Sequence, residues 1–161
     1  MRNGRKKSFM NYPVLHTSRC VITIMSQEDR IWLNRLFNDK DVSYFLEGTN
    51  QFSRTLEATA GFIESMSDAY NRVRGFLWKI TYQDNPIGFV CTIDFDENPS
   101  LCYALKKSYR KKGLMSEALK AILVYQSSIM DRDYYVEINS ENFESYNLCE
   151  KLMSVADIII L

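Results

Sequence analysis

A basic turn, a glycine and the start of a helical pattern follow one another in residues 108–119, SYRKKGLMSEAL. The first N–H groups of a helix have no partner inside the helix, and the helix dipole adds partial positive charge there. Arg110, Lys111 and Lys112 add full charges, and Gly113 has no Cβ to hold a ligand away from the backbone. The stretch predicts a cradle for a phosphate or diphosphate, with a solvated basic loop as the alternative.

Two strands and a helix are expected to position this turn. Residues 100–106 predict a strand before it, residues 115–129 a helix after it, and residues 133–138 a second strand. Because a helix joins the two strands, they can lie parallel. Neither the P-loop pattern nor G-x-G-x-x-G occurs, which disfavours those nucleotide-binding classes.

The rest of the chain predicts a single α/β (α+β) domain. Strands are expected at residues 19–25, 75–82, 87–94 and 157–161, and helices at 26–38, 42–46, 55–70 and 143–152. This order predicts a mixed, mostly antiparallel twisted sheet with helices on both faces. Residues 1–14 are expected to form a basic disordered or extended tail, and residues 15–161 the domain.

Composition narrows the class of protein. Twenty basic and twenty acidic side chains give a formal net charge of zero, which argues against a nucleic-acid binder. No apolar run approaches the roughly 20 residues that span a bilayer. Four scattered cysteines without C-x-x-C spacing predict free thiols in a reducing, cytoplasmic compartment. With His16 as the single histidine, expected on the surface, no metal site is predicted.

Several short motifs, in order, are similar to those of the GNAT superfamily of acetyl-CoA-dependent N-acyltransferases. The turn resembles its Arg/Gln-x-x-Gly-x-Gly/Ala motif, and the segments from about Leu15 to Leu152 resemble the ribosomal-protein N-terminal (alanine) acetyltransferase branch. The matching segments are Thr17-Ser18-Arg19, residues 37–42, Pro86-Ile87-Gly88-Phe89, Arg110 to Met115, Ser116-Glu117-Ala118-Leu119, residues 142–145 and residues 149–152.

The resemblance implies a GNAT-like fold that binds acetyl-CoA between two splayed parallel strands, here residues 100–106 and 133–138. A primary amine, on a protein N-terminus or a small molecule, would attack the thioester directly, with backbone N–H groups near Leu105 polarising its carbonyl. The implied cofactor-binding residues are Leu105, Lys106, Arg110, Lys111, Lys112, Gly113, Leu114, Met115, Ser116, Asn142 and Ser145.

Several residues are candidates for the general acid and the general base of the reaction. The family often has a tyrosine general acid where this chain has Cys149, and Tyr146 lies one helical turn away; both are candidates, with packing as the alternative. Asp94 and Glu137, at or near strand ends, are candidate general bases, with solvation or capping as the alternative. Asn142 precedes a helix, where it would also serve as an N-cap.

Three departures from the family pattern favour a competing hypothesis. Met115 replaces a small residue, although its helical phase turns it toward the core, and Met153-Ser154 replaces a Gly-Phe that normally ends the last helix. The chain also ends where the family continues into a C-terminal hairpin, which predicts an exposed sheet edge and a possible homodimer. The alternatives are a non-catalytic acetyl-CoA-binding or interaction module, and an α/β domain with a solvated basic loop.

Overall fold

The computed structural model describes residues 12–46 and 55–161. Seven strands form one sheet: β1 Val14–His16, β2 Cys20–Ile24, β3 Phe76–Tyr82, β4 Asn85–Ile93, β5 Ser100–Leu105, β6 Tyr134–Val136 and β7 Ile158–Ile160. The described helices are η1 Gln27–Asp29, α2 Arg30–Phe37, α3 Lys40–Leu46, α4 Leu56–Asn71, η2 Lys107–Tyr109, α5 Leu114–Ile129 and α6 Phe143–Leu152. None of these helices is long and apolar enough to cross a membrane.

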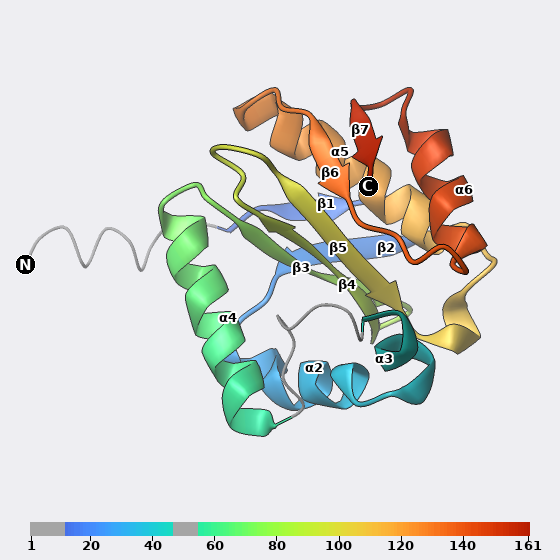
Figure 1. Cartoon of the computed structure of the whole chain (residues 1–161). Coiled ribbons are helices and arrows are strands. Elements are labelled where there is room, and N and C mark those ends of the chain that lie inside the picture. The colour runs from blue at the N-terminus through green and yellow to red at the C-terminus, as the bar shows by residue number, and fades with distance from the viewer. Residues whose placement is uncertain (1–11, 47–54) are drawn as a thin grey trace, which may run out of the picture.

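The strands lie in the sheet in their order along the chain (Figure 1). Each neighbouring pair from β1 to β5 is antiparallel, whereas β5 and β6, and then β6 and β7, are parallel. Helix α5 connects β5 to β6, as a parallel pair requires. The predicted mixed, mostly antiparallel sheet is therefore confirmed.

Helices cover both faces of the sheet, with α5 and α6 on one and α2 to α4 on the other (Figure 1). The division follows from alternation of side chains along a strand. In β4, Val90 belongs to the apolar cluster under α5, whereas its neighbours Phe89 and Cys91 belong to the cluster that includes Leu33 and Ile63. Two apolar layers therefore hold the sheet between the helices.

A buried polar network fixes α5 against the sheet. Gln126 is fully buried, and its Oε1 accepts hydrogen bonds from Trp78 Nε1 at 3.0 Å and Thr92 Oγ1 at 3.1 Å. Its Nε2 donates to the Tyr134 hydroxyl at 3.2 Å. Leaving such groups unpaired in the core costs about 1–3 kcal/mol each, so the network strongly favours one rotation of α5 about its axis.

The structure refines several sequence expectations. A short strand, β1, precedes the first expected strand, and it begins at Val14, the last residue of the expected tail. The turn between β3 and β4 is tighter than expected: only Gln83 and Asp84 form it, with φ of 49° and 62°, as a two-residue type I′ turn requires. Most of the expected tail lies outside the described residues.

Candidate functional site

A cleft opens where β5 and β6 separate. The two strands pair only at Ser100–Tyr135 and Leu101–Val136, after which β5 continues to Leu105. The resulting space of about 670 Å³ is lined by β5, the start of α5, the segment after β6, and α6. The predicted parallel strands therefore frame a cavity large enough for a cofactor.

Backbone groups of β5 face this cleft. Tyr135 N donates to Pro99 O on the β6 side of the strand, and Lys106 N donates to Ile87 O on the β4 side. Backbone groups of a strand alternate in direction, so the amides of Tyr103 and Leu105 point to the side where β6 has ended. The amide nitrogen of Leu105 is therefore available to a ligand in the cleft.

The start of α5 presents open amides at the same cleft. Gly113 is the N-cap residue, with φ of +75° and no side-chain cap, and the first helical hydrogen bond runs from Glu117 N to Gly113 O at 3.1 Å. Within the described chain, the amides of Leu114, Met115 and Ser116 have no hydrogen-bond partner, and all three residues line the cleft. These are the orphan donors of a helix N-terminus, where anions bind.

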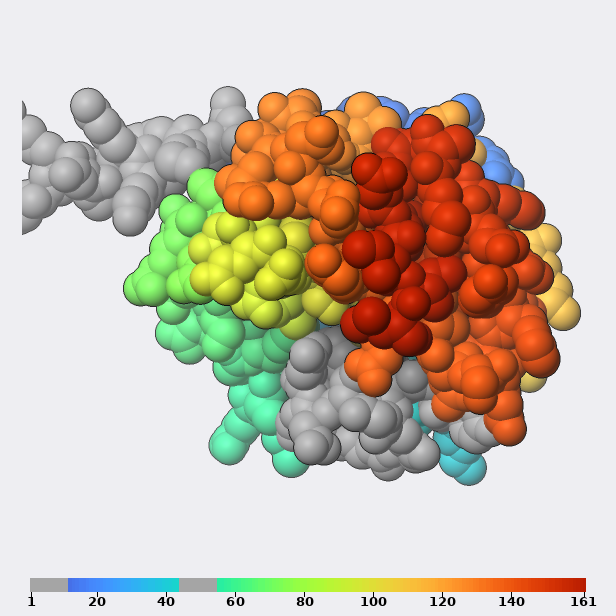
Figure 2. All heavy atoms as spheres, turned by 45° about the horizontal axis from the view of Figure 1, so that its top comes forward, coloured from blue at the N-terminus to red at the C-terminus, as the bar shows by residue number. Residues whose placement is uncertain are grey.

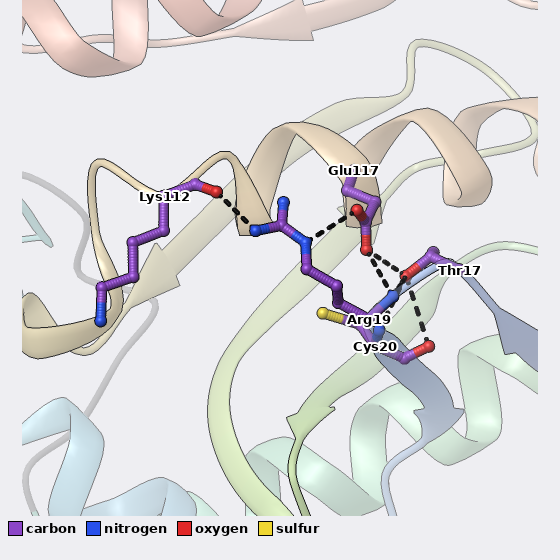
Figure 3. A network of polar contacts seen from close by, with 5 residues as sticks. All are labelled: Thr17, Arg19, Cys20, Lys112 and Glu117. Carbon is purple, nitrogen blue, oxygen red and sulfur yellow. Dashed lines mark hydrogen bonds and ion pairs between the residues drawn. The ribbon is translucent and has the colours of Figure 1, made fainter.

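A clamp from the β1–β2 turn holds this helix start in place (Figure 3). Arg19 donates from one terminal guanidinium nitrogen to Lys112 O at 2.8 Å and from Nε to Glu117 Oε1 at 3.1 Å. The Arg19 backbone N–H and the Thr17 hydroxyl donate to the other carboxylate oxygen of Glu117. A Cβ at Gly113 would approach the Arg19 guanidinium to 3.3 Å, so glycine suits both the positive φ and this contact.

The clamp also sets the ionisation of Glu117. Burial favours the neutral acid, but hydrogen bonds from Thr17 and Arg19, with the charge of Arg19, outweigh burial and lower the pKa of Glu117. A charged Glu117 strengthens each of the hydrogen bonds that it accepts. Glu117 therefore stays ionised at neutral pH and accepts the hydrogen bonds of the clamp as a carboxylate.

The basic residues of the turn have different surroundings. Arg110 lines the cleft, but its Nε donates to Leu105 O at 2.9 Å and a terminal nitrogen donates to Asp41 O at 3.0 Å. Lys111 lines the cleft, is exposed, and lies 3.6 Å from Glu144. Arg110 thus ties the end of β5 to α3, while Lys111 keeps a solvated charge at the rim.

Two other predicted cations point elsewhere. Lys106 Nζ lies 5.9 Å from the ring centroid of Trp32, and Lys112 Nζ lies 5.8 Å from that of Tyr109. Neither lysine lines the cleft. Of the four predicted cations, Arg110 and Lys111 are the two that line the cleft.

The other predicted cofactor contacts are brought together around the cleft. Met115 is 7% exposed and packs in the core under α5, as its helical phase predicted. Asn142 and Ser145 line the cleft from α6, and the Asn142 side chain caps that helix by accepting from Ser145 N at 3.2 Å. The capping hypothesis for Asn142 is confirmed, whereas its cofactor contact stays a prediction.

The candidate catalytic residues are placed unequally. Cys149 is buried beneath the cleft, where burial raises the pKa of its thiol, and Tyr146 is 45% exposed on α6; neither lines the cleft. Of the two carboxylates considered as general bases, Glu137 lines the cleft and Asp94 does not. The described residues include no group of three or more His, Cys, Asp or Glu placed to hold a metal ion.

One cleft residue, Tyr103, was missed by the sequence analysis. Its hydroxyl reaches from β5 to α6, where it hydrogen-bonds to Ser145 Oγ and lies 3.2 Å from Cys149 Sγ. Strand alternation places Tyr103 on the same face as Leu101 and Leu105, so its direction could have been read from the sequence. Its partners on α6, more than forty positions further along the chain, could not.

A match to a protein family agrees with this arrangement. Residues 19–153 match the family model of the acetyltransferase (GNAT) domain. The chain therefore belongs to the GNAT acetyltransferase domain family, and the class of enzyme that this domain defines is an acetyltransferase. No curated protein sequence matches the chain significantly.

Solved structures share the fold at low sequence identity. RimL, a ribosomal L7/L12 alpha-N-protein acetyltransferase in complex with coenzyme A, aligns with a TM-score of 0.75 at 14% identity, over 86% of this chain and 82% of RimL. The ribosomal-protein-S5-alanine acetyltransferase from Vibrio fischeri gives 0.74 at 14% identity, over 87% and 81%. The microcin C7 self-immunity acetyltransferase MccE, in complex with acetyl-CoA and AMP, gives 0.68 at 12% identity, over 83% and 77%.

Proposed function

We propose that the chain is an N-acetyltransferase that binds acetyl-CoA in the cleft between β5 and β6 and transfers the acetyl group to a primary amine. The observation that carries this proposal is the early separation of two parallel strands beside the uncapped start of α5. The open amides of Leu114 to Ser116 suit the diphosphate, with Arg110 and Lys111 beside them.

The chemistry follows from two bound reactants held together. The cleft-facing amide of Leu105 would donate to the thioester carbonyl, where negative charge develops as the amine attacks. Direct attack needs correct positioning rather than a covalent enzyme intermediate or a metal ion. Glu137, on the segment after β6, is the better placed of the two candidate bases to accept a proton from the incoming amine.

A protein N-terminal α-amine is the first candidate acceptor. Its support is the shared fold of RimL and the S5 alanine acetyltransferase, whose names give ribosomal proteins as substrates. The similarity to MccE, a self-immunity acetyltransferase, supports a small-molecule amine as the second candidate. Both acceptors present the same nucleophile, a deprotonated primary amine.

Cytoplasmic location and self-association complete the proposal. Four free cysteines suit a reducing compartment. In the described sheet β7 is an edge strand, its Ile159 is 39% exposed, and the red C-terminal residues form part of the surface in Figure 2. An exposed edge strand with apolar side chains favours pairing with a second copy.

A thermal-shift titration with acetyl-CoA tests cofactor binding. We expect the melting temperature of the chain to rise with acetyl-CoA, because a ligand that binds only the folded state stabilises it. Acetyl-pantetheine, which lacks the diphosphate, should give a smaller rise. Gly113→Trp should abolish the rise, whereas Gly61→Ala should keep it, because Gly61 is exposed with open space around an added Cβ.

Turnover is measured as free thiol released from acetyl-CoA, over a panel of peptides with free N-termini and of small polyamines. Thiol release that depends on one class of amine identifies the acceptor. Binding without turnover on the whole panel would support the non-catalytic module instead. An unchanged melting temperature at millimolar acetyl-CoA would overturn the proposal.

A further inference from the structure

Tyr103 lines the cleft and lies two residues beyond the last β5–β6 pair at Leu101. Its phenol crosses from β5 to α6 and meets Ser145 Oγ, which also belongs to a cleft-lining residue. The buried Cys149 thiol lies 3.2 Å from the Tyr103 hydroxyl. Two hydroxyl groups, both from residues that line the cleft, therefore meet beside a buried thiol.

Other hydroxyl groups of the cleft lining lie away from this inner position. Ser100 lies at the closed end, where β5 still pairs with β6, and Ser116 lies in the first turn of α5. The Tyr109 ring packs edge-on against Tyr82, beyond the end of β5. Tyr103 is therefore the hydroxyl-bearing residue on the part of β5 that has separated from β6, and Ser145 lies opposite it on α6.

We propose that Tyr103 is a catalytic residue whose hydroxyl donates a hydrogen bond to the thioester sulfur as it leaves, with Ser145 orienting the phenol. This inference rests on the proposed function and names a residue for the step that breaks the C–S bond. The cleft-facing amides of β5 and the Tyr103 hydroxyl then stabilise the two atoms that gain negative charge, the carbonyl oxygen and the sulfur.

The step balances without a further reactant. The amine nitrogen bonds to the carbonyl carbon, the C–S bond breaks, and its electron pair goes to sulfur. The proton that the nitrogen loses balances the proton that the thiolate gains, so Tyr103 ends the cycle unchanged. The hydroxyl acts as a donor throughout rather than as a net acid.

Protonation of Tyr103 supports this role. Burial, with the neighbouring Cys149, raises the pKa of Tyr103 well above its usual range, despite the hydrogen bond to Ser145. The hydroxyl is therefore protonated at every pH at which a folded enzyme would be assayed. A donor that stays protonated should raise kcat by the same factor across the pH range of the assay.

The test is Tyr103→Phe, assayed at saturating acetyl-CoA and amine. We expect kcat to fall about 100-fold, which is the effect of removing one donor to a developing negative charge. The KM for acetyl-CoA and the melting-temperature rise with acetyl-CoA should change by less than about twofold, since the phenol contributes to the reacting state rather than to binding. The fall in kcat should be the same at every pH between about 6.5 and about 9, because the phenol stays protonated over this range.

Tyr135→Phe is the matched control, because it removes a phenol hydroxyl from the neighbouring strand outside the cleft lining. It should leave kcat unchanged. An unchanged kcat in Tyr103→Phe, with normal turnover by the parent chain, would overturn this inference alone. A rise in the KM for acetyl-CoA by the same factor as the fall in kcat would also contradict it. So would a fall in kcat that disappears at high pH. No turnover by the parent chain would instead count against the proposed function.

Discussion

Two helices begin at the same cleft, and their first turns are built differently. At α6, the Asn142 side chain accepts from Ser145 N at 3.2 Å, and acidic Glu141 and Glu144 lie beside it. At α5, Gly113 offers no side chain, Arg110 and Lys111 line the cleft beside it, and the Arg19 guanidinium holds the preceding carbonyl. A helix start is therefore not in itself an anion site: the cap and the neighbouring charge decide which of the two can hold a diphosphate.

Placing a carboxylate at the open helix start should have the largest effect. Gly113→Asp should abolish acetyl-CoA binding, because it sets a negative charge and a competing acceptor against the amides of α5. Gly113→Asn is the matched control, since asparagine has nearly the same size, is neutral and tolerates the positive φ. We expect the asparagine chain to keep a measurable melting-temperature rise; equal loss in both variants would show that shape, not charge, decides binding.

Breaking the clamp should weaken cofactor binding less severely. Arg19→Met removes the hydrogen bonds to Lys112 O and Glu117, and should raise the KM for acetyl-CoA about fivefold, for a loss near 1 kcal/mol in a partly exposed site. The kcat at saturation should stay constant, because the reacting groups are untouched. Arg19→Lys should give a KM for acetyl-CoA between those of the parent and of Arg19→Met, since a lysine cannot make both contacts.

Removing the Asn142 cap tests the other helix of the comparison, α6. Asn142→Ala should destabilise the fold by about 1 kcal/mol, the usual effect of losing an N-cap, and Asn142→Ser should recover most of it. Urea unfolding of the three chains measures the difference. An alanine chain as stable as the parent would contradict a capping role for this side chain.

The smallest effect concerns acid sensitivity. Because the pKa of Glu117 is lowered in the folded state, its contribution to stability is present above the unfolded pKa of about 4.3 and is lost as pH falls through the folded value. Glu117→Gln should therefore be less stable than the parent at neutral pH, with the difference shrinking below about pH 4. Melting temperatures across this range measure it, and a constant difference would exclude the linkage.

Local patterns predicted most of the frame of the site. Period-two and helical patterns placed β5, α5 and α6, and a connecting helix implied the parallel pair that opens the cleft. The Asn142 cap was predictable because its partner lies three residues away. Such features depend on contacts within one element or between elements joined by a single connection.

What the sequence did not predict depends on distant partners. The Lys106 side chain lies over the ring of Trp32, far earlier in the chain, so the run of basic residues alone did not reveal that this lysine faces away from the cleft. Arg19 and Glu117 lie 98 positions apart, and nothing in either segment alone indicates that they meet. Strand β1 has three residues and forms only by pairing with β2, which leaves too short a pattern to recognise.

Gln126 has a consequence for the opposite end of its own helix. Since Trp78, Thr92 and Tyr134 all engage this one side chain, α5 cannot swivel or slide without stranding buried donors and acceptors. The direction of the backbone amides that follow Gly113 is therefore fixed in the protein without a ligand. Under the proposed function, acetyl-CoA would meet amides whose direction is already set by buried residues of the core.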